Sequence, residues 1–596
     1  MPRPSARKRS LRVTTTLLTL LSTALAVAVT GPTTAQAAAP QAITVDLGDS
    51  EGPAEGVGSG FLYGLTEDGS GPDDSLLAPL APRSARGGGA RLDGGGWAGD
   101  GYTAGAGYQR RIESALDQAR RLSTPPYDAT YDLLVSDMWG ADTTQAPNTV
   151  YPCTNGDCAN WETFVERVAR DVTASGLDVR FDIWNEPAGA FFPPGFNTEQ
   201  YYRMWDSAVR TLRRVVPDAE IVGPSLWDFS PNNIAPFLDH TQAAGTLPTI
   251  LNWHFSHDPV ADTQTAASML AQRGITGVGL TMNEYIHAPE QRAGYSAWYL
   301  ARIARSGIDS ASHAIWDECC AAGLLDGLLV RGGDGVLRPT GRWWVYRSYA
   351  ELTGDLVRVD SSGAADAVAA VDRARGRAGV LVGDSSGGTP AVDLTVNGIA
   401  SAGVAGPGGV QVTVQRIPDA SPLGQPVTVS TQTLPAGTDT AHVSLAGQAA
   451  QDAFFVTVTP AGPAVSGDAS VTAPDREADF SYGPGWGRTN GVGDMYQGTA
   501  DWSYTPGSTA VVRFTGTRLT LHAVRDSDQG RMLVSVDGST PTLLDNYAPS
   551  RQASSSVWTS PVLPRGPHTA VVTVAQGTNP ASSGGNIALD RAVVTR

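Results

Sequence analysis

Residues 57–353 alternate short β-type apolar runs with segments of helical periodicity, and this rhythm constrains the fold more than any other feature. Strand and helix in alternation predict a parallel α/β fold, and eight strands in roughly 290 residues match a (β/α)8 TIM barrel. An open doubly wound sheet is the alternative, but the glycine runs near Gly87 and Gly94 lack the spacing of a phosphate-binding loop. We expect strands at Phe61–Leu65, Ala90–Leu92, Asp132–Val135, Arg180–Trp184, Glu220–Val222, Ile250–Trp253, Gly279–Met282 and Ser312–Ile315, and helices at Tyr108–Leu122, Trp161–Ser175, Thr198–Val216 and Ala293–Ser306.

The helical signal ends near residue 353, and short alternating β-type runs follow. Residues 354–460 predict an antiparallel β-sandwich, which residues 41–56 are expected to join. A stretch rich in Gly, Ala, Pro and Ser at 461–473 indicates a linker, and residues 474–596 predict a β jelly roll. The chain is therefore expected to be multidomain, with the barrel at 57–353.

The first residues have the pattern of a secretion signal. Five basic side chains precede the apolar stretch Thr14–Val29, and Ala35-Gln36-Ala37 fits a cleavage site, so residues 1–37 are the predicted signal peptide. A retained membrane anchor is the alternative, but the apolar stretch is shorter than the ~20 residues that span a bilayer. We expect a secreted, extracellular protein with no membrane association in its mature form.

The acidic charge balance excludes some partner classes. The formal net charge is −17, and losing five basic side chains with the signal would make it about −22. Such a charge argues against nucleic acid and anionic membranes as partners, and it is compatible with a neutral carbohydrate polymer.

Four cysteines are expected to pair in an exported protein. Cys153 and Cys158 bracket a turn sequence, which predicts a small-loop disulfide and leaves Cys319 and Cys320 as a vicinal disulfide. Cross-links between the two pairs are the alternative. None of the spacings resembles a zinc site, and we expect no metal and no cofactor.

Two glutamates lie at predicted strand ends, where TIM barrels place their catalytic groups. Glu186, preceded by Asn185, ends the fourth strand, and Glu284 ends the seventh, 98 residues later. Two carboxyls about 5–5.5 Å apart can cleave a glycosidic bond by double displacement. Their proximity raises the pKa of one at the expense of the other, so that one acts as the acid and the other as the nucleophile. A structural role is the usual alternative for a single glutamate, but the pair favours catalysis.

The run from Phe181 to Pro187, Phe-Asp-Ile-Trp-Asn-Glu-Pro, resembles clan A of the glycoside hydrolases. Within the clan it is most similar to family 39, the β-xylosidases and α-L-iduronidases, and the resemblance extends loosely over residues 41–460. It implies that Glu186 is the acid/base, Glu284 the nucleophile and Asn185 a ligand of the sugar 2-hydroxyl. The sequence departs from the family at two places. Position 182 is Asp rather than Glu, and the run Thr-Met-Asn-Glu-Tyr around Glu284 differs from the family's usual Thr-Glu-Phe/Trp.

Further candidates for substrate binding occupy other predicted strand ends and loops. Arg91 is expected to orient Glu284 or to form a structural ion pair, and His254 to bond a carboxyl or hydroxyl or to be a core histidine. Trp316 is expected to form the floor of the subsite for the cleaved sugar, and a core tryptophan is the alternative. By resemblance to some arabinofuranosidases, a Cys319–Cys320 disulfide would provide a flat surface beside the sugar. The weaker candidates are Asp93, Asp137, Asp317, Trp97, Trp139 and Trp227.

Pro567-His568-Thr569 and Ala588-Leu589-Asp590 match the closing strands of galactose-binding-like carbohydrate-binding modules, which the terminal β-unit resembles. Trp486, Tyr496 and Trp502 are candidates for stacking on sugars, and a core position is the alternative, expected for at least one of them. A purely structural jelly roll is the alternative for the whole unit. Taken together, these features predict a secreted retaining exo-glycosidase that acts on arabinose- or xylose-containing side chains such as those of arabinogalactan. An endo-acting clan A glycanase and a non-catalytic glycan-binding protein are the alternatives. The expected partner is a carbohydrate polymer or oligosaccharide.

Overall fold

The structure is a computed structural model that describes part of the chain. The described residues are 40–89, 107–135, 152–187, 198–314, 323–361, 363–373, 376–405, 409–461, 478–482, 485–496, 499–539, 541–563 and 566–595. The predicted signal peptide and nearly all of the predicted linker lie outside them.

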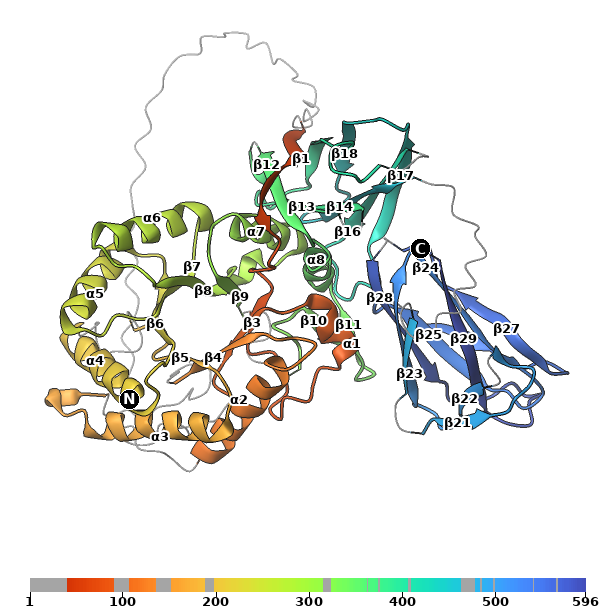
Figure 1. The fold of residues 1–596 in the computed structure, drawn as a ribbon, viewed down its shortest axis with the longest axis horizontal. Coiled ribbons are helices and arrows are strands. Elements are labelled where there is room, and N and C mark those ends of the chain that lie inside the picture. The colour runs from red at the N-terminus through yellow and green to blue at the C-terminus, as the bar shows by residue number, and fades with distance from the viewer. Residues whose placement is uncertain are drawn as a thin grey trace, which may run out of the picture. The chain divides into compact units, whose positions relative to one another are not determined.

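Eight parallel strands close into a barrel, which confirms the predicted TIM fold (Figure 1). One strand prediction is wrong, because the second barrel strand is Ser84–Gly87 and not Ala90–Leu92, which lies outside the described residues. Ser84 and Arg86 are polar and buried, so this strand lacks the apolar signal by which the others were found. The strands are β2 (Gly60–Leu62), β3 (Ser84–Gly87), β4 (Thr130–Leu134), β5 (Arg180–Asp182), β6 (Ile221–Asp228), β7 (Ile250–Phe255), β8 (Gly279–Tyr285) and β9 (Ser310–His313).

Helices follow the strands and surround the barrel (Figure 1). Helix α3 buries Trp161, Phe164 and Val168 at helical spacing as one apolar stripe, and it ends before Gly176, whose φ of 70° suits a left-handed cap. The helices are α1 (Asp74–Leu77), α2 (Tyr108–Leu122), α3 (Ala159–Ser175), α4 (Thr198–Val215), α5 (Pro231–Ala244), α6 (Pro259–Gln272), α7 (Ala293–Ala304) and α8 (Gly341–Tyr349), with short 3-10 turns η1 (Ala78–Leu80), η3 (Thr154–Gly156) and η4 (Ala288–Glu290) and a hairpin of β10 (Leu329–Arg331) and β11 (Leu337–Pro339).

A nine-stranded sheet follows the barrel and encloses its own core, so the predicted β-sandwich is confirmed. Residues from opposite sides of the sheet, such as Val412 and Val443, pack into one apolar cluster. This packing requires the sheet to fold over on itself. The strands, in sheet order, are β17 (Val427–Leu434), β16 (Val410–Ile417), β19 (Ala453–Pro460), β14 (Arg377–Asp384), β13 (Ala365–Asp372), β12 (Asp355–Ser361), β1 (Gln41–Pro53), β15 (Ala391–Asn397) and β18 (Ala441–Ala446).

The sandwich packs directly on helix α7 of the barrel. At Gly383 on β14, a Cβ atom would lie 2.2 Å from the backbone nitrogen of Trp298, so only glycine allows this approach. Gly294, at the start of α7, also donates its backbone N–H to the Gln451 carbonyl. The sandwich is thus seated on the helix that follows the Glu284 strand in the chain.

The C-terminal residues form two facing five-stranded antiparallel sheets around a shared core, as a jelly roll would. Trp486 packs against this core, whereas Trp502 stacks on the exposed Tyr504 at a centroid distance of 5.3 Å. Carbohydrate binding by this region remains a prediction. One sheet contains β20 (Ala478–Tyr482), β23 (Thr509–Gly516), β28 (Gly566–Val574), β25 (Arg531–Val536) and β26 (Thr542–Asp545), and the other β21 (Gly487–Asn490), β22 (Thr499–Ser503), β29 (Ile587–Thr595), β24 (Arg518–Arg525) and β27 (Gln552–Thr559).

The predicted Cys153–Cys158 disulfide is confirmed, with the two Cα atoms 4.1 Å apart. It closes a turn directly before α3 and so fixes the start of that helix. Cys319 and Cys320 lie outside the described residues. No helix among the described residues has both the length and the apolar character needed to cross a membrane.

Candidate active site

Glu186 and Glu284 meet at the barrel mouth, as expected from their positions after β5 and within β8. One oxygen of each carboxyl and a ring nitrogen of His254 all lie within 4.8 Å of one another. Each glutamate is only 6% exposed, and His254 is fully buried. Two acidic groups are therefore held together in a site largely withdrawn from water.

Arg86, at the end of β3, organises the acidic site. Its guanidinium donates three hydrogen bonds: from Nη1 to Glu284 Oε1 at 2.6 Å, from Nε to Asp182 Oδ2 at 2.7 Å and from Nη2 to Asn185 Oδ1 at 2.8 Å. This buried positive charge favours the ionised form of Glu284. Since arginine only donates hydrogen bonds, the Asn185 oxygen must face Arg86 and its amide nitrogen must face elsewhere.

Asp182 is the hub of a network that ties the strands together. Besides the Arg86 ion pair, it accepts hydrogen bonds from Ser225 Oγ at 2.6 Å and from Asn283 Nδ2 at 2.7 Å. Burial raises the pKa of Asp182, while Arg86 and Ser225 act in the opposite direction. Asn252 on β7 holds Ser225 in turn, through its Oδ1 and the Ser225 backbone N–H at 2.7 Å. The network thus joins β3, β5, β6, β7 and β8.

Local backbone irregularities aim the two glutamates. The pairing of β8 with β9 shifts register between Met282 and Tyr285, which allows consecutive Asn283 and Glu284 both to contact groups inside the barrel. Glu186 has a φ of 48°, an uncommon left-handed conformation for a side chain of this size, and its N–H donates to the Ser225 carbonyl. Such constrained backbone is typical of functional sites.

His254, the last residue but one of β7, sits between the two glutamates. Its Nδ1 lies 3.0 Å from Glu186 Oε1 and 3.7 Å from Glu284 Oε1. The shorter distance gives Glu186 the hydrogen bond. Two carboxylates and an imidazole are also possible metal ligands, but Arg86 already supplies Glu284 with a positive charge at 2.6 Å. The geometry therefore favours a proton-transfer pair.

A third carboxyl, that of Asp326, lies near Glu284 and was missed by the sequence reasoning. It is 5% exposed, and its Oδ2 accepts the backbone N–H of Leu62 on β2 at 2.6 Å. Burial raises the pKa of Asp326 well above its ordinary range, and the negative charge of Glu284 adds to this effect. The carboxyl of Asp326 therefore resists ionisation beside Glu284. It lies in a loop with no distinguishing motif.

His313, at the end of β9, makes the stability of the fold depend on pH. It is fully buried beside the rings of Tyr285 and Tyr346, and burial, with a smaller contribution from Arg342, lowers its pKa from 6.5 to about 3. Because the unfolded chain takes up a proton that the folded one refuses, the stability present above pH 6.5 falls as the pH drops toward 3. Between pH 7 and 5 this loss is about 2 kcal/mol.

Replacing His313 by phenylalanine is expected to remove that part of the pH dependence. Urea unfolding of the wild type and His313→Phe at pH 7 and pH 5 measures it, and the free energy of unfolding should fall by about 2 kcal/mol less in the variant. An equal fall in both proteins would contradict the buried, uncharged state of His313.

Several candidate residues from the sequence cannot be placed at the site. Arg91, Asp93, Trp139, Trp316, Cys319 and Cys320 lie outside the described residues, as do Trp97, Asp137 and Asp317. The structure instead places Arg86 against Glu284, where Arg91 was expected. Trp227 lies at the end of β6 and is 43% exposed.

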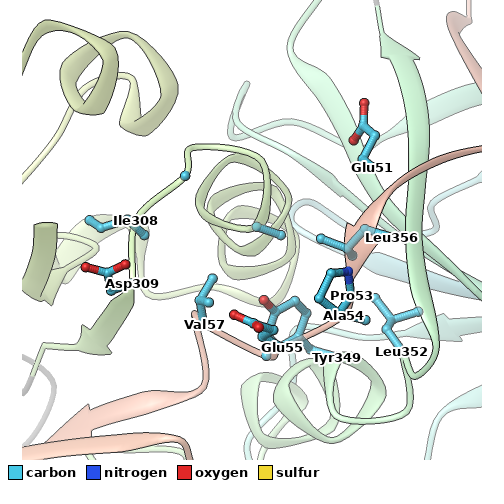
Figure 2. A pocket seen from close by; sticks show the side chains of 13 residues that line it. Glu51, Pro53, Ala54, Glu55, Val57, Ile308, Asp309, Tyr349, Leu352 and Leu356 are labelled. Atoms are coloured by element: carbon cyan, nitrogen blue, oxygen red, sulfur yellow. The ribbon is translucent and has the colours of Figure 1, made fainter. Parts of the chain in front are cut away.

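A cavity of about 430 Å³ lies at the opposite end of the barrel (Figure 2). Its lining includes Val57, shortly before β2, and Ile308 and Asp309, directly before β9. The cavity therefore borders the amino-terminal ends of these barrel strands. It contains none of the residues around Arg86. Since TIM-barrel sites lie at the carboxyl-terminal ends, we assign the candidate active site to the Glu186–Glu284 cluster.

Comparison with known proteins supports the fold. No protein-family profile matches the chain. The chain is similar to the 3-O-α-D-galactosyl-α-L-arabinofuranosidase of Bifidobacterium longum subsp. longum, with 25% identity over 413 residues. This match covers 60% of the chain but only 34% of that enzyme.

Solved structures of other proteins are also similar to this chain. The protein N2152 from Neocallimastix frontalis matches with a TM-score of 0.58 and 24% identity, over 71% of this chain and all of that one. A glycoside hydrolase family 39 enzyme from Xanthomonas axonopodis pv. citri matches with a TM-score of 0.51 and 14% identity, over 71% of this chain and 98% of that one. The resemblance to clan A and family 39 is therefore confirmed at the level of the fold, and the carbohydrate-binding module is not confirmed.

Proposed function

We propose that this protein is a retaining glycoside hydrolase in which Glu284 is the nucleophile and Glu186 the acid/base. The observation that carries the proposal is the pair of buried carboxyls within 4.8 Å at the strand ends. Retaining enzymes hold their carboxyls about 5–5.5 Å apart, whereas inverting enzymes need about 6.5–9.5 Å to admit a water molecule.

The surroundings of the two carboxyls support this division of roles. Arg86 donates to Glu284, which favours the carboxylate needed for attack on the anomeric carbon. Glu186 is hydrogen-bonded to His254, whose imidazole can share a proton with it. Asn185 is fixed by Arg86 with its amide nitrogen free of that contact, which suits donation to a sugar hydroxyl.

The reaction then proceeds in two displacements. Glu284 attacks the anomeric carbon while Glu186 gives its proton to the glycosidic oxygen, so that the carbon–oxygen bond breaks and the leaving group departs as an alcohol. A glycosyl ester on Glu284 results. In the second step Glu186, now a carboxylate, takes a proton from water as the water oxygen attacks the same carbon. The ester bond breaks, Glu284 is restored and the free sugar leaves with its original anomeric configuration.

For the substrate, we propose arabinose- or xylose-containing side chains of polysaccharides, removed from chain ends by a secreted enzyme. The name of the Bifidobacterium relative, an arabinofuranosidase, supports the sugar class. The basic and apolar start of the chain and the Cys153–Cys158 disulfide support export. Endo-acting cleavage and non-catalytic glycan binding are the competing functions.

Incubation with arabinogalactan and a panel of aryl arabinosides and xylosides tests these functions together. We expect sugar release with the anomeric configuration retained in the first product seen by NMR, because each of the two displacements inverts the carbon. Net inversion would rule out Glu284 as a nucleophile. A rapid fall in polymer viscosity would indicate endo cleavage, and binding without any product would indicate a non-catalytic protein.

A further inference from the structure

Among the barrel tryptophans that the structure describes, Trp227 stands out because it faces solvent. It is 43% exposed, whereas Trp161, Trp184, Trp205, and Trp253 are nearly or fully buried in the core. It occupies the carboxyl-terminal end of β6, between the buried Leu226 and the exposed Asp228. The ring is therefore presented at the same end of the barrel as the two glutamates.

The Trp227 ring packs against an aromatic neighbour. It packs edge-to-face against Phe255 of β7, with ring centroids 5.3 Å apart and planes inclined at 65°. Phe255, only 3% exposed, stacks in turn on His287 at 3.8 Å and 25°. His287 is anchored by its backbone N–H, which donates to Glu290 Oε2 at 3.0 Å. Three successive barrel segments thus orient an exposed aromatic surface.

This surface is connected to the acid/base Glu186 through neighbouring residues of β6 and β7. Strand β6 pairs with β5, and the Ser225 carbonyl, two residues before Trp227, accepts the N–H of Glu186. Phe255 directly follows His254, which is hydrogen-bonded to Glu186. Since the acid/base protonates the oxygen of the departing group, that group must lie on this side of the site.

We infer that Trp227 is a stacking platform for a neutral sugar ring in the leaving group, the ring directly beyond the bond that is cleaved. This inference rests on the proposed glycosidase function and extends it to the substrate. The apolar C–H face of a sugar ring can cover an indole, and the contact removes apolar surface from water. The substrate is then a sugar linked to another neutral sugar, as in a branched heteroglycan.

The charges around Trp227 disfavour an acidic ring such as a uronate. Asp228 is exposed next to it, and the Glu290 carboxylate accepts the backbone N–H of His287. His287 offers no compensating positive charge at neutral pH, because burial lowers its pKa although Glu290 opposes the effect. A carboxylate on the bound ring would therefore face like charge.

The test compares Trp227→Ala and Trp227→Phe with the wild type on two leaving groups. Oligosaccharides released from arabinogalactan have a sugar as the leaving group, whereas arabinosyl fluoride loses only fluoride. Truncation of an aromatic anchor should lower kcat/KM for the oligosaccharides about 10- to 100-fold. The loss on the fluoride should be several-fold smaller, and phenylalanine should restore most of the activity. Leu543→Ala, which removes an exposed apolar side chain far along the chain, is the control.

Binding measured without turnover separates this inference from the proposed function. Calorimetric titration of Glu186→Gln with the same oligosaccharides should show weaker binding when Trp227→Ala is added, and no such change with a uronate-terminated leaving group. Equal losses on the fluoride and the oligosaccharides, or binding unaffected by Trp227→Ala, would overturn the platform. Binding that depends on Trp227 in a protein without hydrolytic activity would uphold the platform and overturn the hydrolase.

Discussion

Replacing Glu284 by glutamine is expected to lower kcat by at least about 10⁴-fold on every substrate, the scale of loss when a covalent nucleophile is removed. The amide cannot form the glycosyl ester, whatever the leaving group. The fold should survive, because Arg86 keeps its ion pair with Asp182 when Glu284 loses its charge. Single-turnover kinetics, with unfolding curves to establish an intact fold, measure both effects.

Glu186→Gln is the matched variant, since it alters the other carboxyl of the pair. Its loss should depend on the leaving group: about 10² to 10⁴-fold for sugars, which need a proton, and far less in the first step for activated nitrophenyl glycosides. A glycosyl ester should then accumulate, because water has lost its general base. If Glu284→Gln instead showed the leaving-group dependence, the two roles would have to be exchanged.

The sequence was sufficient to predict the barrel and its two central glutamates because these rest on local signals. The spacing of apolar residues along the chain indicates which segments are strands and which are amphipathic helices. Helix α2 was predicted in this way with the same bounds as in the structure. Trp-Asn-Glu-Pro directly follows the β-type run Arg180–Ile183, which located Glu186 without any knowledge of the packing. The spacing to Glu284 then followed from the repeat length of the fold.

Arg86 could not be predicted because its importance comes from contacts that are distant in sequence. Its partners Asp182, Asn185 and Glu284 are 96, 99 and 198 positions away. Its strand is a short run with two buried polar side chains, which pattern recognition takes for a loop. Asp326 was missed for the same reason, since only its burial near Glu284 distinguishes it from a turn aspartate. The polar residues that point into a barrel therefore have two effects. They carry the chemistry, and they interrupt the apolar pattern from which a strand is predicted.

Replacing Arg86 by methionine is expected to reduce both stability and activity. Asp182 and Glu284 would stay buried without their cation, and breaking a buried ion pair in this way costs about 3–5 kcal/mol. Removing a preorganised donor from the reacting carboxylate should lower kcat/KM about 10² to 10³-fold. Denaturant unfolding and steady-state kinetics measure the two losses.

The double variant Arg86→Met/Asp182→Asn separates the two losses. Neutralising Asp182 removes one of the unpaired buried charges, so stability should partly return, while Glu284 still lacks its cation and activity should stay low. In either variant the acidic limb of the pH–rate profile should move to higher pH, because less favourable surroundings for the carboxylate demand a higher pH to ionise it. If activity recovered with stability, Arg86 would serve the fold alone, and the ionised state of Glu284 would need another source of support.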